Sequence, residues 1–184
     1  GVLFHNGKEM TSEDVLASFE RFRNVSPRKS ILENAAFSAP DKYTFTVSFT
    51  ESNPNFMENL ASPQPPLVIM PKEVRDVEGG KLDKNQIIGT GPYKLVDYVA
   101  DQYVKLERFE DYTADEDHPA SGMGGKNVAY LDKITFNIVP EKQSRLNGLL
   151  AGEYDYAEAL DPSVYGQIAS NSSLQPVVMS PYFK

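Results

Sequence analysis

The segment that most resembles a chemical site is Gly89-Thr90-Gly91-Pro92-Tyr93, because closely spaced glycines often form loops that bind phosphate. A Walker loop needs Lys and then Ser or Thr after its second glycine, and a dinucleotide fingerprint needs a third glycine that opens a helix. Here Pro92 and Tyr93 follow instead and open a strand-like segment. We therefore expect a strained turn with glycine at positive φ rather than a nucleotide site.

The acidic loop of residues 111–127 is a second candidate, because carboxylates and imidazole bind calcium or transition metals. A calcium-binding hand needs Gly at its sixth and Glu at its twelfth position, and neither occurs when counting from Asp111 or Asp115. Runs of like charge are usually exposed to solvent. We therefore expect a solvated loop and no metal site. Its candidate ligands are Asp111, Asp115, Glu116, Asp117 and His118.

The remaining residues offer little to an enzyme. The chain has no cysteine, which excludes thiol nucleophiles, Cys-ligated zinc and iron–sulfur clusters. Its two histidines, His5 and His118, have no serine elbow beside them. The sequence therefore predicts no catalytic activity and no cofactor. The ten tyrosines could grip a small amphipathic solute, although most aromatic side chains belong to the core.

Charge and hydropathy exclude two classes of partner. A net charge of −8 disfavours a nucleic-acid phosphate backbone. A membrane-spanning helix needs roughly 20 consecutive apolar residues, and the apolar run at residues 66–71 is far shorter. We expect neither nucleic-acid binding nor membrane insertion by these residues.

The first half of the chain predicts elements that could position a site. Apolar residues at helical spacing follow Thr11 and Ser12 as far as Val25 and predict a helix. Strict alternation from Tyr43 to Phe49 predicts a half-buried strand, and Asn55 to Leu60 a short helix. Four prolines in residues 62–71 predict an extended connection.

The second half predicts alternating strands and helices, which indicates an α/β lobe with crossover connections. A tight hairpin should join strands Tyr93–Val99 and Tyr103–Phe109. The expected elements after it are a strand at Lys133–Val139, a helix at Glu141–Ala151, a strand at Tyr154–Ala159, a helix from Asp161 to Ala169 and a strand at Leu174–Met179.

Five blocks, taken in order, resemble one family: the extracytoplasmic solute-binding proteins of the dipeptide, oligopeptide and nickel ABC importers (family 5). Each block is weak alone, but their order and spacing cover nearly the whole chain. The blocks are residues 1–8 with 11–15, Gly89–Leu95, Leu106–Phe109, Tyr130–Phe136 and Leu149–Asp155.

The resemblance implies a mixed α+β chain that forms part of a periplasmic-binding-protein type II-like fold. Residues 1–86 would form a portion of a small β-rich accessory domain. Residues 87–184 would form the central segment of one ligand-binding lobe and end near the interlobe hinge. Family members are longer, so we expect a middle piece of a larger chain without its leader. The loop 111–127 departs from the family pattern, so no local role is inferred for it.

The resemblance also implies a function: capture of a small solute, most readily a peptide, by hinge closure, and delivery to the membrane permease of an ABC importer. The location would be the periplasm or the outer face of the cytoplasmic membrane. Candidate ligand-binding residues are Tyr182 at the hinge and the stretch around Arg28 and Ser30. Gly89, Gly91 and Tyr93 match a family motif and would shape the lobe.

Other interpretations stay open at this point. Relatives with one scaffold bind peptides, nickel, opines or sugars, so the resemblance does not fix the solute. An interaction module would present a contiguous apolar patch, and an unrelated enzyme domain would bring together groups with perturbed pKa values.

Overall fold

The computed structural model describes residues 1–62, 65–77, 80–121 and 124–178, which divide into two compact units, Gly1–Phe136 and Asn137–Lys184. The predicted domain boundary between residues 86 and 87 stays a prediction. The helices are α1 (Ser12–Val25), α2 (Phe56–Leu60), α3 (Lys142–Leu150) and α4 (Tyr165–Ala169), with short 3-10 turns η1 (Lys29–Leu32), η2 (Lys72–Val74), η4 (Lys84–Gln86) and η5 (Pro162–Val164). The strands are β1 (Ala35–Asp41), β2 (Thr44–Phe49), β3 (Tyr93–Val99), β4 (Tyr103–Arg108) and β5 (Lys133–Asn137).

Helix α1 begins where the sequence predicts, because Thr11 and Asp14 form a capping box. Asp14 is fully buried, and its carboxylate accepts hydrogen bonds from the Thr11 N–H at 2.9 Å and from the Lys8 Nζ at 2.7 Å. It also accepts one from the Lys72 N–H at 2.9 Å. One carboxylate thus fixes the helix start to the N-terminal segment and to η2.

Burial alone would raise the pKa of Asp14, but the hydrogen bonds from Lys8, Lys72 and Thr11 outweigh it. The pKa of this carboxyl therefore lies below its ordinary value, and Asp14 stays ionised in the folded protein. Lys8 also reaches Glu73 at 3.0 Å, so the buried charge is neutralised in a small network.

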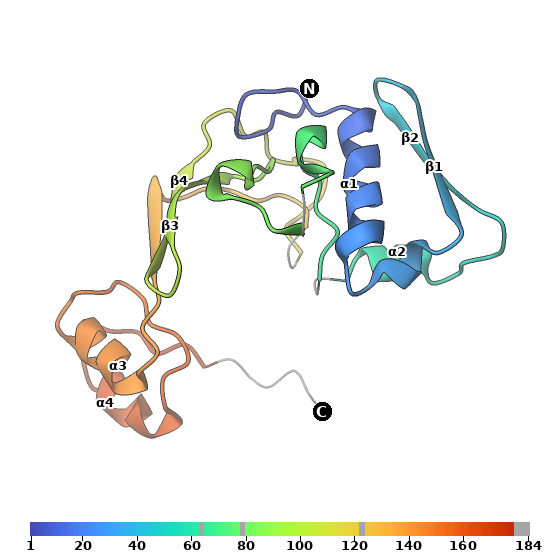
Figure 1. Ribbon diagram of the computed structural model, residues 1–184. Helices are drawn as coiled ribbons and strands as arrows, with labels where there is room; N and C mark the ends of the chain where they lie inside the picture. Colours follow the sequence, from blue (N-terminus) through green and yellow to red (C-terminus); the bar gives the residue numbers. More distant parts are fainter. Residues whose placement is uncertain (63–64, 78–79, 122–123, 179–184) are drawn as a thin grey trace. The chain divides into compact units, whose positions relative to one another are not determined.

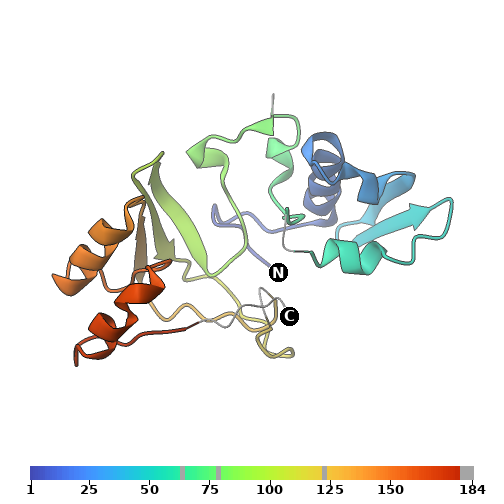
Figure 2. The same ribbon diagram turned by 90° about the horizontal axis from the view of Figure 1, so that it is seen from below.

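The main core lies between α1 and the β1–β2 hairpin, which lie side by side in Figures 1 and 2. Phe19, Phe22, Leu32 and Ala35 are buried at its centre, and the inward side chains of β2 pack around them. The rings of Phe19 and Phe45 lie 4.8 Å apart. The strand predicted at residues 43–49 is confirmed as β2, with its Thr and Ser side chains facing solvent.

Strand β1 was not expected from the sequence. It pairs antiparallel with β2, from Ala35 opposite Phe49 to Asp41 opposite Thr44, and the register shifts between Ser38 and Asp41. Pro40 lies inside that shift and cannot donate a backbone hydrogen bond. The sequence of β1 mixes small residues without a clear alternation, so it does not predict a strand. The strand forms because it pairs with β2.

The second sheet has the strand order β3-β4-β5, and the predicted hairpin is confirmed. Tyr93 lies opposite Arg108 and Val99 opposite Tyr103, with a register shift between Leu95 and Asp97. Asp101 at the hairpin tip adopts φ 59°, a left-handed conformation that Asp tolerates better than most residues. The predicted third strand is confirmed as β5 and ends at Asn137.

In the second unit the two helical segments are confirmed, and two predicted strands are wrong. Leu146 in α3 and Ile168 in α4 are its buried hydrophobic side chains among the described residues. Gly152 ends the α3 region at φ 72°, the position where the sequence predicts a stop. Residues 154–159 and 174–178 form no strand, because a strand needs a ladder partner and the described residues provide none. Met179 lies outside the described residues.

Across the residues that the structure describes, no helix combines the length and the apolar character needed to cross a membrane.

Candidate functional site

The Gly89–Tyr93 turn is held by His5 from the N-terminal segment. The backbone N–H of His5 donates to the carbonyl oxygen of Gly89 at 2.9 Å. The imidazole Nδ1 lies 3.2 Å from the Gly89 backbone nitrogen, and Nε2 lies 3.0 Å from the carbonyl oxygen of Gly91. Residues more than eighty positions apart are therefore joined by three hydrogen bonds.

The partners of His5 fix its tautomer. The Gly89 N–H can only donate, so Nδ1 must accept and carry no proton. The Gly91 carbonyl can only accept, so Nε2 carries the hydrogen. Burial lowers the pKa of His5 below its ordinary value of 6.5, and the nearby Lys94 charge acts in the same direction, against the Gly91 hydrogen bond. The ring is therefore neutral at pH 7, and it packs edge-on against Phe109 with centroids 5.1 Å apart.

The expectation of positive φ at Gly89 and Gly91 is wrong. The left-handed glycines of the described residues are elsewhere in the chain, and neither glycine of this turn is among them. A Cβ on Gly89 would lie 3.6 Å from the His5 ring, an ordinary contact, and one on Gly91 would meet nothing within 4 Å. The turn keeps its shape through the hydrogen bonds of His5 and not through left-handed backbone.

Tyr93 connects this turn to the last strand region of the sheet. Its hydroxyl oxygen accepts a hydrogen bond from the Leu131 N–H at 3.0 Å. The Phe109 N–H donates to the carbonyl oxygen of Pro92 at 2.9 Å. The matched motif residues thus contact backbone and core, and their role in shaping a lobe stays a prediction.

The predicted ligand-binding residues lie apart from the turn. Arg28 precedes η1, and its guanidinium donates to the carbonyl oxygen of Asn59 at 3.0 Å. Ser30 lies within η1 and is exposed. Tyr182 falls outside the described residues. The structure therefore places Arg28 and Ser30 close together on one short turn, and their binding role stays a prediction.

The acidic loop makes local contacts. His118 Nδ1 lies 3.0 Å from an Asp115 carboxylate oxygen, and the Lys126 Nζ lies 2.5 Å from Glu116. In the described part of this loop and elsewhere in the described ranges, no three side chains of the His, Cys, Asp and Glu types come together to hold a metal ion. These contacts are local to the loop.

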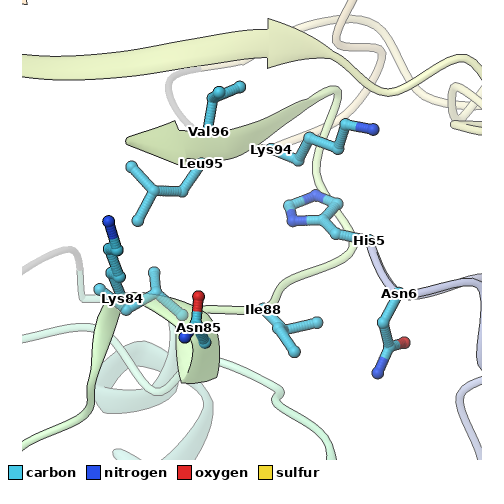
Figure 3. A pocket seen from close by; sticks show the side chains of 9 residues that line it. His5, Asn6, Lys84, Asn85, Ile88, Lys94, Leu95 and Val96 are labelled. Atoms are coloured by element: carbon cyan, nitrogen blue, oxygen red, sulfur yellow. The ribbon is translucent and has the colours of Figure 1, made fainter. Parts of the chain in front are cut away.

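Three surface hollows lie near the turn. One, of about 230 Å³, has walls from His5, η4 and the start of β3; Figure 3 shows the His5 ring and Lys94 beside it. Four of the charged side chains around a neighbouring hollow form ion pairs: Lys94 with Glu107 at 3.0 Å, and Arg108 with Asp132 at 2.6 Å. None of the three contains Arg28 or Ser30. All three are partly open to solvent.

Sequence reasoning missed two residues that organise this region, His5 and Asp14. Both lie inside the first block of the family resemblance, so the family motif could have pointed to them. Their partners, Gly89 and Lys72, lie 84 and 58 positions away, which periodicity cannot reveal.

The model for the bacterial extracellular solute-binding proteins, family 5 middle region, matches residues 1–183. The oligopeptide-binding protein AppA of Bacillus subtilis is 26% identical over 172 residues, which cover 85% of this chain and 28% of AppA. The chain thus spans less than a third of the length of that relative.

Solved structures agree on the fold. AppA from Bacillus subtilis in complex with a nonapeptide matches 91% of this chain and 32% of that chain, with a TM-score of 0.66 and 26% identity. NikZ from Campylobacter jejuni in complex with Ni(L-His) matches 93% of this chain and 32% of that chain, with a TM-score of 0.72 at 20% identity, a likeness of fold alone. The expected mixed α+β chain of a periplasmic-binding-protein type II-like fold is confirmed. The chain belongs to the family 5 bacterial extracellular solute-binding proteins and corresponds to their middle region.

Proposed function

We propose that this chain is the middle region of a protein that captures peptides outside the cytoplasmic membrane and delivers them to an ABC importer. The observation that carries the proposal is the family match over residues 1–183, together with AppA, a relative named as an oligopeptide-binding protein. Capture would proceed by closure of two lobes around the solute, without any bond being made or broken.

The proposed domain division places residues 1–86 in a small accessory domain and 87–184 in one ligand-binding lobe that ends near the hinge. The α1 core and the β1–β2 hairpin belong to the first part, and the β3-β4-β5 sheet to the second. His5 would link the two parts, because its backbone N–H and its ring contact Gly89 and Gly91 in the turn before β3.

Two properties of the described residues fit a binding protein better than an enzyme. Several charged side chains of the hollows are held in ion pairs, and both ring nitrogens of the partly buried His5 are hydrogen-bonded to backbone groups. A location in the periplasm or at the outer face of the membrane, with a permease as partner, follows from the family and forms part of the proposal.

Calorimetric titration of the protein as its gene encodes it tests the function. The probes are a mixed pool of di- to oligopeptides, then the nickel–histidine complex, an opine and a sugar. Heat with the peptide pool supports peptide capture. Heat with only one of the other probes keeps solute capture and overturns the peptide, and no heat with any probe rejects the proposal in favour of an interaction module.

The proposed binding role of Arg28, Ser30 and Tyr182 needs single variants. Arg28→Ala, Ser30→Ala and Tyr182→Phe should each weaken peptide affinity. Arg28→Ala should also lower the melting temperature, because it removes the hydrogen bond to the Asn59 carbonyl oxygen. Arg75→Ala is a matched control, because its exposed guanidinium pairs with Asp76 and Glu20 at the surface. Unchanged affinity in all three variants would remove these residues from the site.

A further inference from the structure

His5 occupies an unusual position for an ionisable side chain. The carbonyl oxygen of Gly91 and the N–H of Gly89 hold its two ring nitrogens, and no carboxylate is among the ring contacts in the described structure. The described part of the chain has one other histidine, His118, whose ring meets the Asp115 carboxylate at the surface. The two histidine rings therefore lie in different surroundings.

A proton on His5 must go to Nδ1, because Nε2 already carries a hydrogen. A protonated Nδ1 cannot accept a hydrogen bond, so the Gly89 N–H would face another N–H. The bonds from Nε2 to Gly91 and from the His5 N–H to Gly89 survive, because neither uses Nδ1. Protonation thus opens one of three hydrogen bonds and leaves the donor of Gly89 without a partner.

The charged neighbours of His5 give an imidazolium little support. Lys94 on β3 and Lys84 on η4 line the hollow beside the ring, and both carry positive charge. The side facing β4 has Phe109, which contributes an aromatic ring and no charge. The other ionisable groups around this region are Lys8, Glu107, Arg108, Glu110, Asp111, Asp132 and Lys133.

The nearby carboxylates are engaged elsewhere. Glu107 pairs with Lys94, while Glu110 and Asp132 pair with Arg108. Asp111 is exposed at the rim of the hollow. A proton on His5 would therefore gain no direct carboxylate partner in the arrangement that the structure shows.

We propose that His5 is a proton-sensitive clamp: its neutral ring fixes the Gly89–Gly91 turn to the N-terminal segment, and acidification releases the Gly89 N–H. The turn leads directly into β3, so its release loosens the entry to the β3-β4-β5 sheet. The proton-sensitive clamp needs no bound solute, so its test is independent of the proposed peptide capture.

The test uses the protein as its gene encodes it, without solute. Nitrogen-15 NMR of the imidazole rings assigns His5 through the signal lost in His5→Gln. At pH 7 the expected spectrum shows the Nε2–H tautomer. Hydrogen exchange then follows the Gly89 amide, whose protection factor should fall roughly fivefold as His5 becomes protonated, the factor that corresponds to one ordinary hydrogen bond.

The matched control is His118→Gln, which should keep the pH-dependent loss of Gly89 protection. In His5→Gln that pH dependence should disappear, because glutamine does not titrate. If His5→Gln folds poorly, the His5 ring is assigned instead by through-bond correlation to its own backbone signals, and the wild-type measurements then decide the matter. A His5 ring protonated on Nδ1 at pH 7, or Gly89 protection that does not change while His5 titrates, would overturn the proposal.

Discussion

The region around α1 and the second unit, residues 137–178, differ in how completely they are held together. Around α1, a cluster of buried aromatic and aliphatic side chains is closed by the β1–β2 hairpin, and the buried carboxylate of Asp14 has all its partners. In the second unit, two short helices bury Leu146 and Ile168, and the segments expected as strands stay without a ladder. The local sequence pattern forms helices in both regions, but among the described residues only the first region has a paired strand and a buried ionic network beside its helix.

The largest expected difference between the two regions comes from their cores. Phe22→Ala should lower the free energy of unfolding by about 3–5 kcal/mol, because it removes a ring from a closed cluster. Ile168→Ala should cost about 2 kcal/mol, at the low end for such a change, since a smaller core collapses more easily around the lost volume. Denaturant unfolding of both variants checks this, and Val25→Ala, at an exposed position, is the control. Equal losses would break the comparison.

A substitution of Asp14 tests how much the buried polar network stabilises the region around α1. Asp14→Asn should cost about 3 kcal/mol, because the Lys8 ammonium and the Lys72 N–H would lose a buried anionic acceptor. Since the pKa of Asp14 is lowered by folding, its stabilisation is complete above the ordinary value of 3.8 and is lost as pH falls through the lower folded pKa. The variant should lose that acid dependence.

Denaturation midpoints between pH 2 and pH 6 measure this effect. Glu13→Gln serves as the matched control, because Glu13 is exposed in the same helical turn and pairs with Lys72 at the surface. A Glu13→Gln variant as damaging as Asp14→Asn would mean that the helix terminus, and not the buried network, is responsible.

Arg145 connects separate segments of the second unit by hydrogen bonds. Its guanidinium donates to the carbonyl oxygens of Val139, Pro140 and Ala159. Ala159 adopts φ 53°, which is costly for alanine, so this contact holds a strained residue. Arg145→Gln should cost about 2 kcal/mol, and hydrogen exchange should rise within residues 137–178 only. Lys142→Gln, on the exposed face of α3, should leave exchange unchanged; increased exchange in β1 or β2 would contradict the division into units.

The smallest expected losses of stability come from replacing single glycines with alanine. Gly152→Ala should cost about 1 kcal/mol, because its left-handed φ of 72° strains any side chain, although nothing lies within 4 Å of the added carbon. Gly91→Ala should cost less than about 0.5 kcal/mol, because its backbone is not left-handed and its surroundings are open. Paired thermal melts compare them, and a larger loss at Gly91 would restore the interpretation of a strained turn.

The sequence predicts those elements that carry their own signal. Helix α1 has a capping box and an apolar stripe, and the β3–β4 hairpin has two strand-like segments joined by a short turn. Strand β1 has no such signal, because Ala35, Ala36 and Pro40 have low strand preference and the strand forms by pairing with β2.

The candidate site is harder to predict than the fold. The family motif identifies Gly89, Gly91 and Tyr93, but the glycines suggested a left-handed turn, and the hydrogen bonds of His5 replace it. Contacts between distant segments depend on tertiary structure, which composition and periodicity do not encode. For the same reason the strands predicted at residues 154–159 and 174–179 are not found at 154–159 and 174–178, where the described residues provide no neighbour to pair with.

Pro40 has a consequence for self-association. In the described residues β1 and β2 form a two-stranded sheet, so each strand has one side along which another chain could add. Pro40 removes a backbone donor from β1 and coincides with its irregular register, which makes that side a poor template. Replacing it with valine would restore one backbone donor to β1, and the protein should become more prone to form intermolecular sheets at high concentration.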